Sequence, residues 1–276
     1  MPERARGVLI VAASLDEKGG LQGRTLHVAR LLARHRPVTM LTWRARRFPS
    51  VEHVGSNLKI LRLPSVATWA RDQPAPVAWV NTAVSLLTGA VAALWIRSRW
   101  DVAVGMGLVP EGVLAAACGV ALRKRTVVQT WLPGPRGNVA RLESSPLARL
   151  FKRMLRSATF LGETDEMVTE LQAAGFAPDR IRKLGWGVEL DRFVPADGLR
   201  PQAKERLGIP SDRRVLAYWG RFDLQQKRLD VLLEAWRRVS PQGWQLLLAG
   251  DGPDRDWIED MGASLDPNPV ILGWQE

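Results

Sequence analysis

The sequence contains few of the residues that build metal sites and disulfides. Its 276 residues include one cysteine, Cys118, and three histidines, His27, His35 and His53. Cys118 lies in an apolar run from 112 to 122, which predicts a buried, reduced thiol and is typical of a cytosolic protein. Because the histidines are widely spaced, the sequence predicts neither a zinc site nor a nucleophile paired with a base.

Long apolar runs are also scarce. The run 7–13 is too short for the apolar region of a signal peptide and predicts a first buried strand. The segment 73–96 has no charged residue and is long enough to cross a bilayer, but it contains Asn81, Thr82 and Ser85. We therefore expect a helix that packs on the sheet and can touch lipid, with a transmembrane span as the alternative.

Acidic residues are few in the N-terminal part of the chain. Residues 1–195 hold 28 Lys and Arg against 15 Asp and Glu, a net charge of +13, whereas residues 196–276 hold 11 against 13, a net charge of −2. The basic part favours an anionic partner such as a membrane surface or a phosphorylated acceptor. Nucleic acid is less favoured, since no aromatic platform is interleaved with the cations. An Arg-rich surface that merely keeps the protein soluble is the alternative.

Short apolar runs alternate with segments of helical period, which predicts an α/β fold built on parallel sheets wound by helices. Helices are expected over 25–34 and, as a pair, between 146 and 174. The expected strands are 7–13, 38–42, 58–63, 102–105, 126–130 and 181–184, followed by 215–219, 245–249 and 270–272.

A polar stretch at 196–204 separates two predicted domains, residues 1–195 and residues 196–276. The second domain has only three expected strands. A doubly wound domain needs about five or six. The second domain is therefore predicted to be incomplete.

The most informative motif is Tyr218-Trp219-Gly220-Arg221-Phe222-Asp223, with Lys227 six residues after the arginine. An expected strand leads into Gly220, whose missing side chain lets the backbone approach an anion. Arg221 offers a planar fork of donors, and Lys227 offers a point charge at an expected helix start. The combination suits a diphosphate, and a solvated basic loop is the alternative.

Two further glycine turns follow expected strands. Gly250 and Gly252 stand in the sequence Gly-Asp-Gly-Pro after the strand 245–249, and Gly19 and Gly20 follow the first strand. All four are candidates for loops lining a cleft, where backbone amides meet a phosphate or an acceptor. A simple tight turn is the alternative for Gly19 and Gly20. Without a G-x-G-x-x-G motif, a dinucleotide-dependent dehydrogenase is disfavoured.

These residues resemble the second-domain signature of the retaining glycosyltransferases of the GT-B fold, family four, also called glycosyl transferases group 1. Asp230, Leu232, Leu233 and Ala235 extend the resemblance. It implies two Rossmann-like domains, the first binding acceptor and the second binding a nucleoside diphosphate sugar. By this resemblance, a hexose moves to a hydroxyl acceptor, a lipid or a glycan, without a metal or other cofactor. Arg221 and Lys227 would stabilise charge on the leaving diphosphate.

The sequence departs from the family pattern in two places. Leu132 stands where many relatives carry a histidine that contacts the donor sugar, and a leucine forms no hydrogen bond with a hydroxyl. The E-x7-E region, whose glutamates contact sugar and ribose in the family, would lie beyond Glu276. We therefore expect a C-terminally truncated chain that is inactive by itself and leaves Trp236, Trp257 and Trp274 in water. The alternative to an enzyme is a catalytically dead remnant that serves as a basic membrane- or partner-binding module.

The first domain also contains a basic segment and an isolated glutamate of interest. The segment 146–156 predicts a basic amphipathic helix, suited either to an anionic membrane or to ordinary packing on the core. Glu111 is expected to stabilise a helix start rather than to act in the cleft. The expected location is cytoplasmic, with peripheral attachment to the inner face of the membrane.

Overall fold

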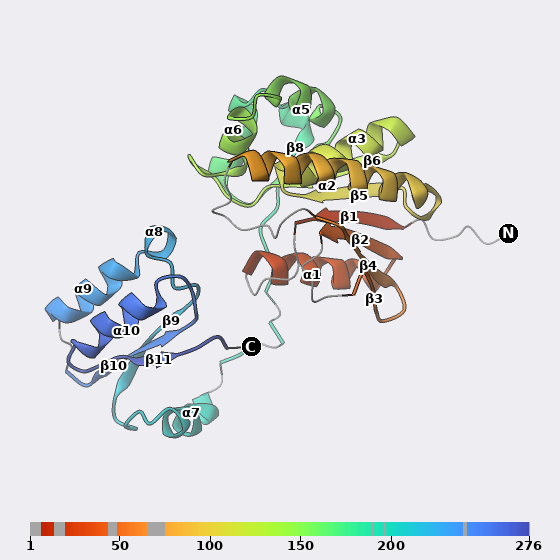
Figure 1. Ribbon diagram of the computed structural model, residues 1–276. Coiled ribbons are helices and arrows are strands. Elements are labelled where there is room, and N and C mark those ends of the chain that lie inside the picture. Colours follow the sequence, from red (N-terminus) through yellow and green to blue (C-terminus); the bar gives the residue numbers. More distant parts are fainter. Residues whose placement is uncertain are drawn as a thin grey trace. The chain divides into compact units, whose positions relative to one another are not determined.

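The computed structural model describes residues 7–13, 20–43, 49–65, 75–188, 190–191, 193–195, 197–239 and 242–275. Contacts divide the chain into two compact units, Met1–Gly187 and Val188–Glu276. Both are drawn in Figure 1. The segment 188–195, which the sequence assigned to the first domain, groups with the second unit.

Unit 1 is built on one eight-stranded sheet with the order β3-β4-β2-β1-β5-β6-β7-β8. All neighbours are parallel except β3, which pairs antiparallel with β4 at the edge. The order changes direction between β1 and β5, as in doubly wound sheets, whose ligands bind at the carboxyl ends of the strands. The strands are β1 (Val8–Ala12), β2 (Val38–Trp43), β3 (Val51–Val54), β4 (Leu58–Leu63), β5 (Val102–Met106), β6 (Arg125–Gln129), β7 (Thr159–Gly162) and β8 (Ile181–Lys183).

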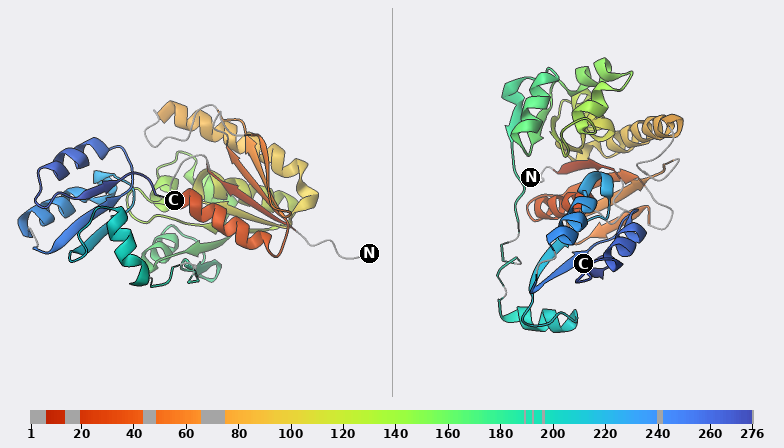
Figure 2. Two further views of the ribbon diagram at one scale, coloured as in Figure 1. Left: turned by 90° about the horizontal axis from the view of Figure 1, so that it is seen from below. Right: turned by 90° about the vertical axis from the view of Figure 1, so that its left-hand side faces the viewer.

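Helices cover both faces of this sheet. Figures 1 and 2 show α1 on one face and α2 with α3 on the other. The helices are α1 (Gly20–Ala33), α2 (Ala75–Trp95), α3 (Val113–Leu122), α4 (Asn138–Glu143), α5 (Ala148–Leu155) and α6 (Asp165–Ala173), with single turns at Arg97–Arg99, Leu108–Gly112 and Pro178–Arg180.

Strand β1 shows why both faces are covered. Alternate residues of a strand point to opposite faces of the sheet. Ile10 packs in the cluster that includes Ala29 of α1, whereas Leu9 and Val11 pack in the cluster that includes Ala93 of α2. A strand that is apolar at every position therefore fits only between two layers of helix.

Unit 2 contains a three-stranded parallel sheet of order β11-β10-β9. Its core gathers Phe222, Leu233, Trp236, Leu248 and Ile258. Its elements are a single turn at Asp197–Leu199, α7 (Arg200–Arg206), β9 (Arg214–Trp219), α8 (Leu224–Lys227), α9 (Leu229–Val239), β10 (Trp244–Ala249), α10 (Arg255–Ala263) and β11 (Val270–Leu272).

One tryptophan prediction for this unit is wrong. Trp236 is only 4% exposed, because it packs in the core of unit 2, and its indole Nε1 donates to the carbonyl of Pro267 at 3.3 Å. Trp257 and Trp274 are 42% and 39% exposed, as predicted. The helices of unit 2 thus bury more of the apolar surface than the strand count suggested.

Two strands, β3 and β7, were not predicted from the sequence. The expected pair of helices between 146 and 174 is interrupted by β7, a four-residue strand that pairs with both β6 and β8. β3 is an exposed edge strand with the sequence Val-Glu-His-Val, which lacks a buried apolar run. Both are too short for periodicity to identify them.

The charge-free segment 73–96 forms helix α2 over Ala75–Trp95. None of the helices in the described part of the chain combines the length and the apolar character needed to cross a bilayer. Cys118 is buried in α3, as predicted, and burial raises the pKa of its thiol to about 11.

Candidate functional site

At the carboxyl end of the unit 2 sheet, backbone hydrogen bonds join the turn after β9 to the turn after β10, and the turn after β10 to the end of β11. The N–H of Gly220, after β9, donates to Ala249 at 3.0 Å, and the N–H of Phe222 donates to Asp251 at 2.9 Å. The N–H of Gly250, after β10, donates to Leu272 of β11 at 3.3 Å. The turns after β9 and β10 therefore pack together at the edge where open α/β sheets bind ligands.

Gly220, Gly250 and Gly252 occupy positions where a side chain does not fit. A Cβ on Gly250 would lie 1.8 Å from the carbonyl oxygen of Gly220, and one on Gly252 would lie 2.1 Å from that of Phe222. Gly220 and Gly250 both have φ of +157°, which L side chains rarely adopt. The glycines thus allow the turns to pack directly on each other. Close packing of the two turns is therefore a structural reason for these glycines. Their role in ligand binding stays a prediction.

Arg221 and Lys227 both belong to the connection between β9 and α9, and both side chains are exposed. Lys227 is the last residue of the short helix α8, and Arg228, with φ of +53°, separates it from α9. The sequence placed Lys227 at a helix start, and this detail is wrong, because α8 and α9 are two helices. No described carboxylate pairs with Lys227. Two cations are therefore presented to solvent on one connection.

This connection is held by two aspartates to which no role was assigned from the sequence, although Asp223 belongs to the motif 218–223. Asp223 is 8% exposed, and its Oδ1 accepts from the N–H of Gln226 at 2.9 Å, capping α8. The Oδ2 of Asp254 accepts from the N–H of Leu224 at 2.7 Å. Aspartate before a helix is a recognisable capping signal. Asp223 was therefore identifiable from the sequence, whereas the contact of Asp254 depends on the fold.

Tyr218 holds the turn after β9 through a hydrogen bond. Its hydroxyl donates to the carbonyl of Arg221 at 2.9 Å. Burial, together with the charge of Asp223, raises the pKa of Tyr218, so the hydroxyl stays a donor at neutral pH.

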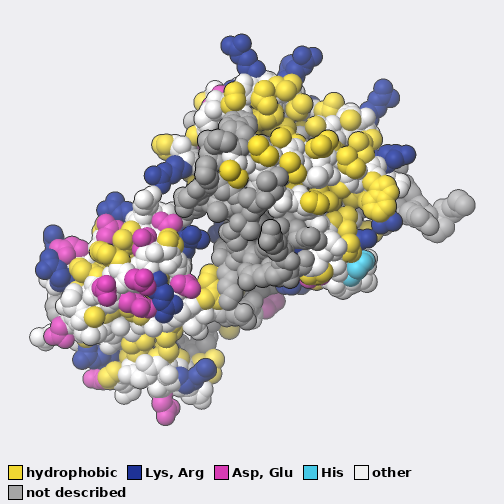
Figure 3. Space-filling view, viewed as in Figure 1, with side chains coloured by type: hydrophobic (Ala, Val, Ile, Leu, Met, Phe, Trp, Pro, Cys, Tyr) yellow, Lys and Arg dark blue, Asp and Glu magenta, His cyan; other side chains and the backbone are white. Residues whose placement is uncertain are grey.

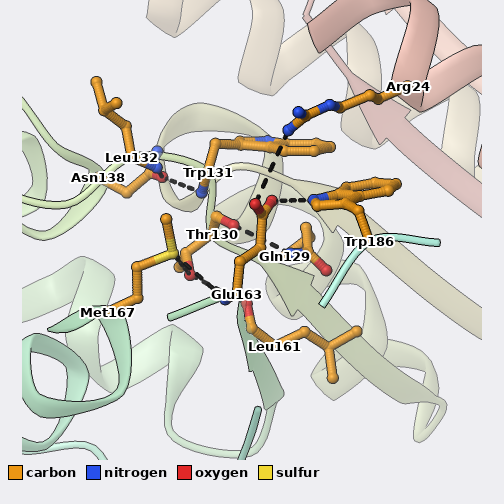
Figure 4. A network of polar contacts seen from close by, with 10 residues as sticks. All are labelled: Arg24, Gln129, Thr130, Trp131, Leu132, Asn138, Leu161, Glu163, Met167 and Trp186. Atoms are coloured by element: carbon orange, nitrogen blue, oxygen red, sulfur yellow. Dashed lines mark hydrogen bonds and ion pairs between the residues drawn. The ribbon is translucent and has the colours of Figure 1, made fainter. Parts of the chain in front are cut away.

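A second polar cluster lies in unit 1, at the carboxyl ends of β6, β7 and β8 (Figure 4). Trp131 follows β6, Glu163 follows β7 and Trp186 follows β8. The two indole rings stack with centroids 5.3 Å apart and an angle of 7° between their planes. The indole N–H of Trp186 donates to Glu163. Arg24 of α1 lies 5.5 Å from the Trp186 ring centre and 3.8 Å from Glu163.

The backbone around Trp131 is held by side chains of neighbouring elements. The Oδ1 of Asn138 accepts from the N–H of Trp131 at 2.6 Å and from that of Leu132 at 3.2 Å. The hydroxyl of Thr130 donates to the carbonyl of Leu161 at 3.0 Å. Within the described part of the chain, the indole Nε1 of Trp131 is buried without an acceptor. Together these contacts make a fixed aromatic surface beside a carboxylate.

Glu111 lies at the carboxyl end of β5, in the turn Leu108–Gly112 that leads into α3. Its side chain is buried, and burial raises its pKa to about 7, against the opposing effects of a backbone hydrogen bond and of Arg141. The predicted position at a helix start is confirmed. Neither the burial of Glu111 nor its raised pKa was predicted from the sequence.

The other residues considered from the sequence are Gly19, Gly20 and Leu132. Gly20 is the first residue of α1 in unit 1, and Gly19 lies outside the described residues. Leu132 is 40% exposed beside the aromatic cluster. Among the described residues, no three His, Cys, Asp or Glu side chains gather where they could hold a metal ion.

Residues 213–276 match the family model described as Glycosyl transferases group 1. This segment contains Gly220, Arg221 and Lys227 and the turn formed by residues 250–253. The family resemblance predicted from the sequence is therefore confirmed in this segment.

Two curated relatives carry related sequences. D-inositol 3-phosphate glycosyltransferase 1 of Catenulispora acidiphila is 33% identical over 153 residues, which are 54% of this chain and 31% of that protein. D-inositol 3-phosphate glycosyltransferase of Saccharomonospora viridis is 44% identical over 73 residues, which are 26% of this chain and 16% of that protein. The chain thus matches less than a third of the length of either relative.

Solved structures resemble almost the whole chain. HepE of Anabaena in complex with UDP-glucose aligns with a TM-score of 0.67 at 13% identity, over 98% of this chain and 69% of that one. WaaG, a glycosyltransferase involved in lipopolysaccharide biosynthesis, aligns with a TM-score of 0.66 at 17% identity, over 98% and 70%. At these identities the likeness concerns the fold alone. The predicted GT-B-like fold class is confirmed.

Proposed function

Because its segment 213–276 matches glycosyl transferases group 1 and its fold is GT-B-like, we propose that this protein is a glycosyltransferase. It would transfer a hexose from a nucleoside diphosphate sugar to a hydroxyl acceptor with retention at the anomeric carbon. One observation carries the proposal. The interlocked turns at Gly220 and Gly250 present Arg221 and Lys227 at the carboxyl edge of the unit 2 sheet.

In this proposal the two cations act on the diphosphate of the donor. Arg221 forms paired hydrogen bonds with phosphate oxygens, and Lys227 adds a point charge. As the bond between sugar and phosphate breaks, negative charge grows on the leaving diphosphate, and fixed cations stabilise that charge. No metal ion is required for this role. Since HepE was solved with UDP-glucose, a uridine diphosphate sugar is the first donor to test.

The acceptor would bind to unit 1. The stacked indoles of Trp131 and Trp186 provide aromatic surface at the carboxyl edge of the sheet, with Glu163 and Arg24 beside them. Aromatic faces and nearby carboxylates are suited to a ligand with both apolar faces and hydroxyls. A lipid-linked or glycan hydroxyl fits this chemistry.

The net charge of +13 over residues 1–195 supports a peripheral protein on the anionic inner face of the membrane. Attraction to such a surface is screened over about 10 Å at 0.1 M salt. The proposal therefore includes a cytoplasmic location with reversible, salt-sensitive membrane contact.

The release of UDP from UDP-glucose by the purified chain tests the proposed activity, and turnover well above background would overturn the expectation from the sequence that this chain is inactive by itself. Arg221→Ala and Lys227→Ala should each lower turnover by roughly 10² to 10³, as for other donors that stabilise transition-state charge. Arg237→Ala is the matched control, because Arg237 is an exposed arginine on α9 of the same unit that pairs with Glu234 at 2.9 Å. Equal turnover in all four chains would remove this site from the mechanism. No turnover together with intact vesicle binding would favour a membrane-binding module.

A further inference from the structure

Helix α2 turns its large apolar side chains toward solvent. Leu87 is 68% exposed, Val91 is 62% exposed and Trp95 is 80% exposed, and they follow one another at spacings of four residues. Val80 and Leu94 are also exposed along the helix. Residues four apart lie on one face of a helix, so these side chains form a single stripe.

The buried side of α2 has the opposite character. Asn81 and Ser85 are fully buried, and Gly89 and Ala93 continue the same face. A Cβ on Gly89 would lie 2.3 Å from Cδ2 of Leu114 of α3, so a larger residue here would have to displace the Leu114 side chain. An ordinary surface helix buries its large apolar residues and exposes its polar ones. In α2, Leu86 packs against the core, but Leu87, Val91 and Trp95 lie outside it, so core packing does not explain the outer stripe.

Cations border the stripe, and no charged residue interrupts it. Arg97 and Arg99 follow the end of α2, and Arg123 follows α3, where Val120 is 57% exposed. All three arginines are exposed, and no described carboxylate pairs with any of them. Figure 3 shows a broad hydrophobic area over α2 with Lys and Arg side chains at its margins.

We propose that the outer face of α2 is a docking surface for an anionic lipid bilayer. The stripe would enter the boundary between headgroups and acyl chains with α2 lying in the plane of the membrane. The arginines at the end of the stripe would contact lipid phosphates. A cation near an anionic membrane surface contributes about 1 kcal/mol of binding free energy. This inference deepens the membrane part of the proposed function and does not depend on catalysis.

Helix α5, which the sequence suggested as the membrane contact, is less suited to that role. Its Phe151 and Leu155 are buried in the core, and the half-exposed large apolar residues are Leu150 and, just before the helix, Leu147. Its cations Arg149 and Arg153 face solvent and can add electrostatic attraction. The apolar contact therefore belongs to α2.

Co-sedimentation with vesicles of phosphatidylglycerol and phosphatidylcholine tests the assignment. The variant Leu87→Gln, Val91→Gln, Trp95→Gln should bind at least about tenfold more weakly than the wild type, a loss of about 1.4 kcal/mol. The control Val231→Gln, Val239→Gln replaces two exposed valines of α9 in unit 2 and should bind like the wild type. Circular dichroism and thermal unfolding should show that all three chains fold equally.

Equal vesicle binding by the folded α2 variant would overturn the inference. It would also be overturned if the wild type formed dimers in lipid-free sedimentation and the α2 variant did not, because a second copy would then cover the stripe. Release of UDP from UDP-glucose in lipid-free buffer separates the two proposals. Lost vesicle binding with unchanged UDP release supports docking by α2. Lack of UDP release in every chain counts against the proposed glycosyltransferase activity and does not affect the docking proposal.

Discussion

Asp223 links Arg221 to the helix that carries Lys227. Its Oδ2 lies 3.6 Å from Nε of Arg221, and its Oδ1 accepts the hydrogen bond that caps α8. A single carboxylate, largely buried, therefore orients both proposed diphosphate cations. Because α8 has only four residues, the cap is a large part of what holds it in place.

Replacement of Asp223 should separate the capping role from the charge. Asp223→Ala should lower the free energy of unfolding by about 1 kcal/mol, the usual cost of losing a cap. Asp223→Asn should stay within about 0.5 kcal/mol of the wild type, because asparagine caps as well as aspartate and a half-exposed ion pair contributes little. Urea unfolding measures both. Equal losses in the two variants would assign the stability to the contact with Arg221 rather than to the cap.

Glu111 should make the stability of unit 1 depend on pH. Its pKa of about 7 in the folded protein exceeds the ordinary value of 4.5. Between these values the folded chain binds more protons than the unfolded chain, so the stability decreases as pH rises. The contribution is complete below about pH 4.5 and is lost as pH rises through 7, with a total of roughly 3 kcal/mol.

Glu111→Gln removes this titration with little change in shape. Urea unfolding at pH 5, 6, 7 and 8 should show the variant gaining stability relative to the wild type as pH rises. The difference between the two chains isolates Glu111 from all other titrating groups. A constant difference across this range would mean that Glu111 is ionised in the folded protein at all of these pH values.

The stacked indoles should give a spectroscopic signal. The two indoles lie 5.3 Å apart in nearly parallel planes, so their electronic transitions couple, and transition dipoles that are rotated against each other within those planes produce an exciton couplet in circular dichroism. Trp131→Phe and Trp186→Phe should each remove the couplet and lower the unfolding free energy by about 1 kcal/mol. Trp257→Phe, at an exposed tryptophan of α10, is the control. A couplet that survives both replacements would contradict the stacking.

The parts of the fold that follow from local pattern were predictable. The apolar runs that form β1, β4 and β10 stand out in the sequence, and they lie where they were expected. β7 was not predictable in the same way, since its four residues follow a basic helix and precede a capped one. It is a strand because β6 and β8 pair with it on either side, and that information is not local.

The two candidate sites also differ in whether their residues are local in the sequence. Gly220, Arg221 and Lys227 lie within eight consecutive residues, so their spacing was visible in the sequence. Trp131, Glu163 and Trp186 are far apart in the sequence and meet because each follows a strand of one parallel sheet. With β7 missing from the prediction, Glu163 had no strand end to follow. A correct strand order would have brought the three together.

Direct binding of a nucleoside diphosphate tests the central claim, that Arg221 and Lys227 hold the donor diphosphate. Calorimetric titration of the whole chain with UDP, ADP and GDP should show binding of at least one of them. For that nucleotide, Arg221→Ala and Lys227→Ala should each weaken affinity by about tenfold to one hundredfold, the range of a charge-assisted hydrogen bond. Arg237→Ala should bind like the wild type. Equal affinity in all four chains, or no binding by the wild type, would contradict the account.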